Sequence, residues 1–282
     1  MNVQDLINEG IELFENKEFD EAIAKLNQAL GEIEDKNRQI QEQIEIQSGL
    51  GLCYLEQAKQ AQGKESDQLF GQAVEHFQQQ LSLAEQLADQ QNSLQQQINA
   101  QLLLGNCYLE QAKKAKGKES EQLFGQAVEH YRQQLSLAKQ LTDEQNSLQE
   151  QINTQHLLGR CYLEQAMKAQ GKESEQLFVF GQAVEHYRQQ LRLAEQLADK
   201  QNSLQEQNNV ESWLGLCYFE QAMKAQGKES EQLFEQAVKH RQQQLRLAEQ
   251  LADKQNSLQQ QINAESWLGL CYFEQAMKAQ GK

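Results

Sequence analysis

Two short stretches decide the fold of this chain: Leu104-Gly105-Asn106-Cys107-Tyr108 and, further on, Ala127-Val128-Glu129-His130-Tyr131. The first stretch occurs five times in related form, each time with its tyrosine. These tyrosines are Tyr54, Tyr108, Tyr162, Tyr218 and Tyr272, at intervals of 54, 54, 56 and 54 residues. The second stretch returns around Ala73, Ala183 and Ala237. Such regular self-similarity is the signature of a repeat array, in which each copy stacks on its neighbours.

The composition favours helix along nearly the whole chain. Proline is absent, and Ala, Leu, Gln, Glu and Lys dominate the 282 residues, whereas strands need β-branched residues. A mean hydropathy of -0.80 would be compatible with disorder, but the apolar residues recur at helical spacing, which a disordered chain does not require. We therefore expect an all-α, folded protein.

The charge of the chain restricts its partners. A formal net charge of -15 and a pI near 4.9 argue against binding to nucleic acid or to an anionic membrane, because both need clustered Lys and Arg. The N-terminus has no charged-then-apolar leader, and no run of about 18 apolar residues occurs. The expected compartment is the cytoplasm.

The copy that begins at Ser93 shows how each unit is expected to fold. Ser93 and Gln96 form a capping-box pattern, which predicts a helix N-terminus at Ser93. An apolar stripe with helical spacing runs from Leu94 to Ala112, and Gly117 suits a left-handed residue at the helix end. Ser120 is then expected to cap a partner helix that is antiparallel to the first. Each helix should contain about 22–24 residues, near 35 Å in length.

Two regions depart from this pattern. The first copy is shorter and predicts helices near residues 3–15 and 18–34, with a pause around Asp35-Lys36-Asn37. Phe178-Val179-Phe180-Gly181 carries two residues more than the equivalent Phe124-Gly125. Two extra residues rotate a helix by about 200°, so the insertion should sit in the turn or form a bulge, with an aromatic at the rim.

These landmarks predict a division of residues 1–282 into one short repeat, four long repeats and a last helix. The ranges are 1–37 for the short repeat, 38–92, 93–146, 147–202 and 203–256 for the elongated repeats, and 257–282 for an unpaired terminal helix. Residues 265–282 duplicate residues 211–228 without change. The apolar side of this last helix is expected to be uncovered, either because the chain is a fragment or because the helix pairs with another molecule.

The paired Leu-Gly…Tyr and Ala…Tyr spacing resembles the tetratricopeptide repeat (TPR), and the elongated copies resemble the adaptor-type TPRs of cell-polarity proteins. The resemblance covers essentially the full chain. It implies a right-handed α-solenoid of antiparallel helix pairs with about 11 helices, in which the first helix of each pair lines a concave groove that binds peptides. A spectrin-like three-helix rod is the alternative fold, but it does not explain the paired spacing.

Carrying the TPR groove over by spacing gives a set of candidate ligand-binding residues. These are Asn99, Asn106, Asn153, His156, Arg160, Asn209 and Asn263, with the acidic Glu110, Glu164 and Glu220. Glu45, Ser48, Leu52 and Leu102 occupy the same rows in other copies. A ladder of asparagines can hydrogen-bond an extended peptide backbone, and the acidic row would favour a basic partner. The alternative is a solvated face that has drifted after duplication.

The remaining reactive side chains point to structure rather than chemistry. Cys53, Cys107, Cys161, Cys217 and Cys271 stand at one equivalent position, and without a Cys-x-x-Cys pair they are expected to be small buried residues. His76, His130, His186 and His240 are expected on the solvated surface, with metal binding or pH sensing as the alternative. Trp213 and Trp267 are expected to pack between helices, or else to anchor a ligand. No catalytic, cofactor or metal site is predicted.

The sequence thus predicts a non-enzymatic scaffold that binds a peptide segment of a protein partner of basic character. Two alternatives stay open: a regulatory or sensor segment of a longer multidomain protein, and a structural array that self-associates through its C-terminal helix.

Overall fold

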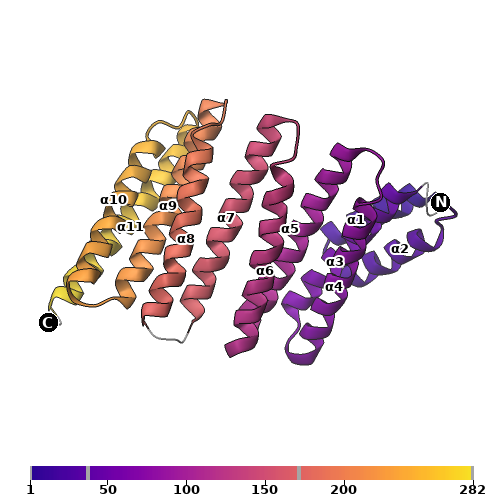
Figure 1. Cartoon of the computed structure of the whole chain (residues 1–282), viewed down its shortest axis with the longest axis horizontal. Coiled ribbons are helices and arrows are strands. Elements are labelled where there is room, and N and C mark those ends of the chain that lie inside the picture. The colour runs from indigo at the N-terminus through magenta and orange to yellow at the C-terminus, as the bar shows by residue number, and fades with distance from the viewer. Residues whose placement is uncertain (1, 36–38, 170–172, 281–282) are drawn as a thin grey trace. The chain divides into compact units, whose positions relative to one another are not determined.

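A computed structural model describes residues 2–35, 39–169 and 173–280, which contain eleven helices and no strand (Figure 1). The predicted pause at Lys36 and Asn37 and the turn at Gly171 lie outside these residues. The helices are α1 (Val3–Glu15), α2 (Phe19–Gly31), α3 (Ile40–Gln60), α4 (Gly63–Ala84), α5 (Gln90–Lys114), α6 (Gly117–Ala138), α7 (Glu144–Lys168), α8 (Glu173–Ala194), α9 (Lys200–Lys224), α10 (Gly227–Ala248) and α11 (Lys254–Gln280).

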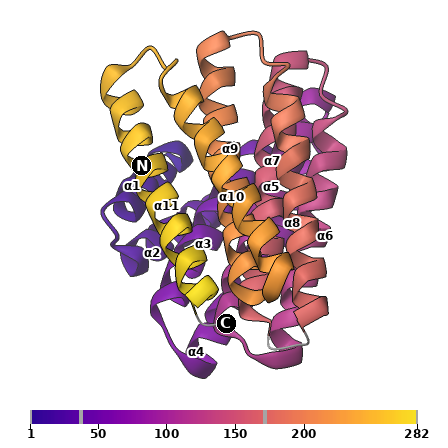
Figure 2. The same cartoon turned by 90° about the vertical axis from the view of Figure 1, so that its left-hand side faces the viewer.

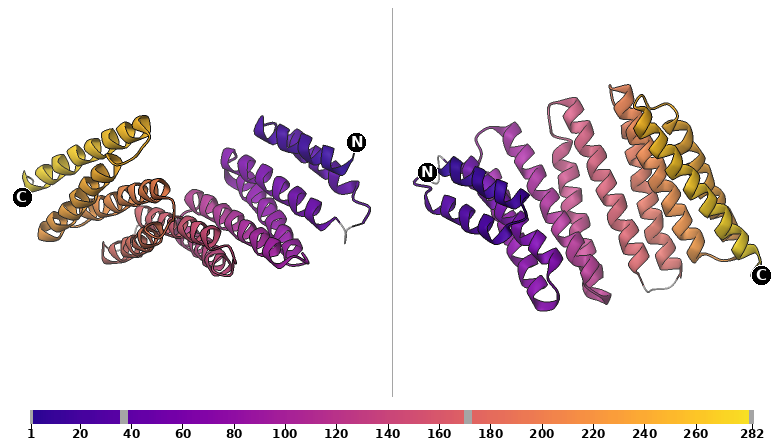
Figure 3. Two further views of the ribbon diagram at one scale, coloured as in Figure 1. Left: turned by 90° about the horizontal axis from the view of Figure 1, so that it is seen from above. Right: turned by 180° about the vertical axis from the view of Figure 1, so that it is seen from behind.

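The chain forms two compact units, residues 1–143 and 144–282. Unit 1 holds α1 to α6 and unit 2 holds α7 to α11. Within each unit every helix packs on the next, and the first helices of successive pairs also touch, α1 with α3, α3 with α5, and α7 with α9. Figures 2 and 3 show this side-by-side order within each unit. The predicted all-α helical repeat of solenoid type is confirmed at this level.

The glycine of the repeat permits the close packing of the two helices in a pair. Gly105 of α5 is buried against Tyr131 of α6, and a Cβ at Gly105 would lie 2.5 Å from the Tyr131 ring. The Tyr131 side chain is fully buried, and its hydroxyl donates a hydrogen bond of 2.8 Å to Asn106 Oδ1. The buried ring supplies apolar area while its hydroxyl keeps a partner.

The helix starts differ from the prediction. Asp89 caps α5, since its carboxylate accepts a hydrogen bond of 2.7 Å from the Asn92 N–H. Ser93 lies inside the helix, and its hydroxyl donates a hydrogen bond of 2.7 Å to the carbonyl of Ala84, at the end of α4. The predicted serine cap is therefore wrong: an ionised carboxylate is the stronger acceptor at a helix N-terminus, and the serine closes the preceding helix instead.

The turn between the helices of a pair also differs in detail. α5 ends at Lys114, and Gly117 is the first residue of α6 rather than the end of α5. Gly117 has a φ of +58°, the left-handed conformation predicted for it. Ser120 does not cap α6. Its hydroxyl donates a hydrogen bond of 2.8 Å to the Ala112 carbonyl of α5. Serine hydroxyls in this repeat thus satisfy the free carbonyls that end a helix.

The two-residue insertion leaves the buried register of α8 intact. Phe180 is fully buried, like Phe124 and Phe234 at the equivalent positions. Phe178 is 68% exposed, which confirms the prediction of an aromatic at the rim. Ala183 and Tyr187 are fully buried, like Ala127 and Tyr131 of α6, so the packed part of α8 from Phe180 onward keeps the register of the other copies.

Candidate functional site

A cavity of about 550 Å³ in unit 1 is the main candidate for a binding site. It is lined chiefly by α1, α3 and α5, the first helices of three successive pairs, and we call it the unit-1 groove. Its apolar wall is formed by Ile11, Phe14, Leu26, Ile44, Leu52, Leu102 and Leu103. A cavity of this size with mostly apolar walls is typical of a ligand site.

Leu26 of α2 forms the floor of the groove between α1 and α3. A Cβ at Gly10 would lie 2.8 Å from Leu26 Cδ2, and a Cβ at Gly49 would lie 2.9 Å from Leu26 Cδ1. Both glycines line the groove, while Leu26 itself is 1% exposed. The two glycines therefore let one leucine fill the joint of two helices, and this packing fixes the depth of the groove.

The polar lining of the groove carries negative charge. Glu15 and Glu45 contribute carboxylates, and no Lys or Arg is among the lining residues. Gln41 donates a hydrogen bond of 3.3 Å to Glu45 Oε1. The field in the groove therefore favours a cationic group on a ligand.

Gln80 of α4 is the one groove residue that is both deeply buried and incompletely hydrogen-bonded. Its side chain is 2% exposed, and its Oε1 atom has no hydrogen-bond partner among the residues that the structure describes. A buried carbonyl oxygen without a donor costs about 1–3 kcal/mol. The equivalent oxygens of Gln134 and Gln190 also lack a partner among the described residues, so this cost recurs in successive copies and is not specific to the groove.

The groove brings together several of the positions that were predicted from spacing. Asn99 lines it, with Glu45, Ser48, Leu52 and Leu102 of the same rows. Asn106 does not line it, because its side chain accepts the hydrogen bond of Tyr131.

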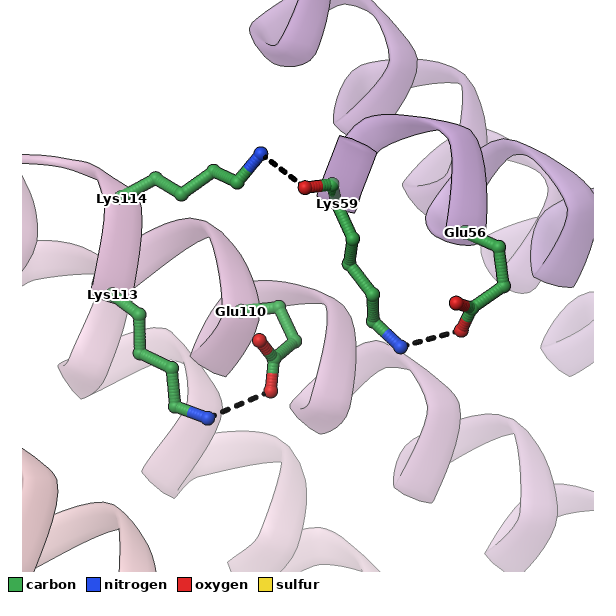
Figure 4. Close-up of polar contacts among 5 residues, drawn as sticks. All are labelled: Glu56, Lys59, Glu110, Lys113 and Lys114. Carbon is green, nitrogen blue, oxygen red and sulfur yellow. Dashed lines mark hydrogen bonds and ion pairs between the residues drawn. The ribbon is translucent and has the colours of Figure 1, made fainter. Parts of the chain in front are cut away.

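The acidic row is neutralised in unit 1. Glu110 pairs with Lys113 at 2.8 Å, and Glu56, one copy earlier, pairs with Lys59 at 2.5 Å (Figure 4). The adjacent Lys114 donates instead to backbone carbonyls at the end of α3, including Lys59 O at 2.8 Å. The charge of Glu110 is therefore compensated by Lys113. It attracts a basic partner less than the predicted acidic row implied.

The predicted asparagines of unit 2 are engaged within their own helices. Asn153, Asn209 and Asn263 each accept a hydrogen bond from the glutamine four residues earlier, at 3.2, 3.0 and 3.2 Å. These bonds use the carbonyl oxygen, so the amide N–H groups are what the side chains offer to a ligand.

The other predicted residues of unit 2 are partly buried. His156 packs against the rings of Tyr187 and Trp213, and burial, aided by the nearby Arg160, lowers its pKa. Burial raises the pKa of Glu220, against the opposing effect of Lys224. Glu164 is half-buried on α7.

The histidines of the second helices were expected on the solvated surface, but the structure shows them half-buried. His130 is half-buried, and its ring stacks on that of Tyr108 with the ring centroids 5.3 Å apart. Its Nδ1 forms a hydrogen bond of 2.7 Å with Gln101 Oε1. His76, His186 and His240 repeat this stack on Tyr54, Tyr162 and Tyr218. The expectation was wrong because the ring of the repeat tyrosine extends across the joint and covers the imidazole.

The cysteines and tryptophans behave as structural residues. All five cysteines are free and buried, as predicted; burial raises the pKa of Cys53 to about 11 and of Cys107 to about 12, which makes both thiols poor nucleophiles. Trp213 stacks on Tyr187, and Trp267 makes an edge-on contact with Phe219, which confirms the packing interpretation. Within the described ranges, no group of three His, Cys, Asp or Glu could hold a metal, and no helix has the length and apolarity to cross a membrane.

Reasoning from sequence missed Gln80 and the contribution of α1. One signal could have pointed to Gln80: a glutamine recurs four residues before the last buried alanine of each long second helix, as Gln80, Gln134, Gln190 and Gln244. A polar residue that interrupts a buried stripe at the same place in each copy needs a partner.

Comparisons with known proteins do not extend this description. No family model matches the sequence, and no curated protein matches it. One similar solved structure is described as "DHF58 filament"; it is 14% identical, with 98% of this chain and 96% of that chain covered and a TM-score of 0.18. A likeness with so low a TM-score carries no argument about fold or function.

Proposed function

We propose that this chain is a non-enzymatic scaffold of the cytoplasm that binds a peptide segment of a partner protein in the unit-1 groove. The observation that carries the proposal is a cavity of about 550 Å³ with apolar walls and the carboxylates of Glu15 and Glu45 in its lining. The paired helices and the Leu-Gly…Tyr spacing further support an array of TPR type, in which first helices present the ligand surface.

The lining of the groove indicates what kind of segment would bind. Ile11 is 44% exposed at the rim and Leu102 is half-buried, so apolar side chains of a ligand would gain by covering them. Glu15 and Glu45 favour a basic residue beside the apolar ones. The proposed ligand is therefore an apolar segment flanked by Lys or Arg.

A pair of variants at equivalent positions tests the proposal. A random peptide library is selected against the full-length chain, and the enriched peptides are then measured on two variants. Asn99→Trp places an indole in the unit-1 groove, whereas Asn153→Trp makes the same change one copy later, at an exposed position of unit 2. Circular dichroism checks that both variants keep their helix content.

The expected result is enrichment of apolar–basic peptides that lose affinity for the Asn99→Trp variant and keep it for Asn153→Trp. Peptides that bind both variants equally well would show that the groove is not the binding site. Failure of every peptide to bind the natural chain would refute the proposed function.

A further inference from the structure

The two carboxylates of the unit-1 groove, Glu15 and Glu45, have no ion-pair partner among the described residues. Glu15 is exposed and Glu45 is half-buried, and the hydrogen bond that Glu45 accepts comes from the neutral amide of Gln41. By contrast, Glu9 of α1 is paired with Lys25 at 2.9 Å. The groove therefore keeps two negative charges that a cationic ligand would pair with.

Leu26 shows how the two helices that carry these acids are aligned. Its side chain lies where a Cβ at Gly10 of α1 and a Cβ at Gly49 of α3 would be, so the two glycines stand at about the same height in the groove. Glu15 follows Gly10 by five residues, and Glu45 precedes Gly49 by four residues.

The helices α1 and α3 run in the same direction. Val3 at the start of α1, Glu32 just after the end of α2 and Glu42 in the first turn of α3 line one cavity, so these three helix ends lie together. Glu15 and Glu45 are therefore on opposite sides of the level of the two glycines. Nine residues of helical rise, at about 1.5 Å each, separate the two acids by about 14 Å along the helix axes.

Each end of the groove carries further negative charge. Glu15 is the last residue of α1, whose last turn contains no basic residue, and the carbonyl groups at a helix end carry a partial negative charge. Lys17, in the turn that follows, forms no ion pair with Glu15. At the other end, the cavity beside Glu42 is also lined by Glu32, Glu34 and Asp35. Both ends thus favour a cation, and the apolar wall lies between them.

The lining between the two acids suits an extended chain. Gln96 and Asn99 of α5 line the groove, and in the described part of the chain neither side chain has a hydrogen-bond partner. An extended peptide offers backbone N–H and C=O groups to such amides, whereas a helix bonds its own. Over about 14 Å, a cavity of about 550 Å³ has a cross-section of about 40 Å², close to that of one extended chain and about half that of a helix.

The geometry of an extended chain then sets the spacing of the basic residues. Successive side chains point to opposite faces, and the chain rises by about 3.4 Å per residue. Residues i and i+4 therefore point into the groove together, about 14 Å apart, which matches the separation of the two acids. Residue i+2 points the same way and meets Ile11 and Leu52, which line the groove near the level of the glycines.

We infer that the unit-1 groove binds an extended segment with Lys or Arg at positions i and i+4 and an apolar residue at i+2, one basic residue pairing with Glu15 and the other with Glu45. The inference rests on the proposed function and specifies the ligand of the same site.

Fluorescently labelled peptides of twelve residues and one composition provide the probes. Each carries two lysines with one leucine between them in a background of Ser and Thr, and the lysines are two, four, six or nine positions apart. Fluorescence anisotropy is followed as full-length chain is added. The peptide with lysines four apart is expected to bind most tightly.

Charge-removing variants then test the pairing. Glu15→Gln and Glu45→Gln should each weaken binding of this peptide by about two- to fivefold, the range of partly exposed ion pairs. Glu12→Gln is the matched control, because it removes the same charge from an exposed residue of α1 outside the lining and should have a smaller effect. When one lysine of the peptide is replaced by glutamine, only one of the two acids should lose its effect.

Three results would overturn the inference. The spacing of nine could bind most tightly, which would indicate a helical ligand; Glu12→Gln could weaken binding as much as Glu15→Gln; or both acids could couple to the same lysine. Peptides that lose affinity for Asn99→Trp but are indifferent to lysine spacing would refute the pairing and leave the proposed function standing. If no peptide binds the natural chain, both fail.

Discussion

Replacing Arg241 by phenylalanine should stabilise unit 2. Arg241 is 1% exposed and stands where Phe77, Tyr131 and Tyr187 stand in the other copies. Its guanidinium lies 4.6 Å from the centre of the Trp267 ring and donates a hydrogen bond of 2.9 Å to Gln244 Oε1. Its Nε has no partner among the described residues. A cation thus occupies a position that is built for an aromatic ring.

The magnitude follows from the charge. Burial lowers the pKa of Arg241 from 12.5 to about 10, and at about 1.4 kcal/mol per pKa unit the buried cation costs roughly 3 kcal/mol. Removing it leaves Gln244 Oε1 without a donor, the state in which Gln80 already exists beside Phe77, and this offsets about 1–3 kcal/mol. The net gain should be at most about 2 kcal/mol, within the range seen when buried ionic groups give way to apolar ones.

Urea denaturation followed by circular dichroism measures the effect. With a slope of about 2–3 kcal/mol per M, the midpoint of unit 2 should rise by roughly 0.5 M. Tyr187→Phe is the control, because it removes a buried hydroxyl that has no partner among the described residues and should not destabilise the unit. If Arg241→Phe unfolds at lower urea than the natural chain while Tyr187→Phe does not, the guanidinium contributes more than its burial costs, and the reasoning fails.

Three further predictions use unit 1. Gly105→Ala should cost about 1–3 kcal/mol because its Cβ would lie 2.5 Å from the Tyr131 ring, whereas Gly125→Ala, with nothing within 4 Å of its Cβ, should add about 0.5–1 kcal/mol through helix propensity; urea midpoints separate the two. Burial lowers the pKa of His76 and His130 below 6.5, so the unfolded chain takes up protons first and stability should fall as the pH drops below about 6.5. Replacing both histidines by phenylalanine should reduce the difference between the urea midpoints at about pH 7.5 and about pH 5.5. Lys114→Met should lower the melting temperature, because its ammonium donates to three carbonyls at the end of α3 and their loss should cost about 1 kcal/mol.

The repeat spacing was sufficient to predict the helices and their buried stripes. The interval from Gly105 to Tyr131 is constant enough to place both residues on facing sides of a helix pair, and the structure joins them. The helix ends were not predictable in the same way. Ser93 has the pattern of a cap, but its hydroxyl reaches the Ala84 carbonyl of the preceding helix, and only tertiary position decides between these acceptors.

The candidate site was predictable in part, for a related reason. Spacing placed Asn99 and Leu102 on the ligand side of α5, and both line the unit-1 groove. Spacing could not show that Asn106 would be engaged by Tyr131, nor that Gln80 of a second helix would reach the cavity. Such contacts depend on which side chains of neighbouring helices lie next to one another after packing, and a periodic sequence pattern does not predict this.

The chemistry of equivalent positions argues that the copies do not bind one ligand in the same way. Lys59 and Lys113 of unit 1 neutralise the acidic residues three positions before them, but in unit 2 the same position holds Met167 and Met223, which are 46% and 38% exposed. Exposed thioethers favour apolar contacts that adapt to their partner, whereas ion-paired lysines do not. A segment selected by α1, α3 and α5 would therefore not be held equally by the first helices of unit 2, and for this reason the Asn99 variant should lose the peptide while its counterpart one copy later keeps it.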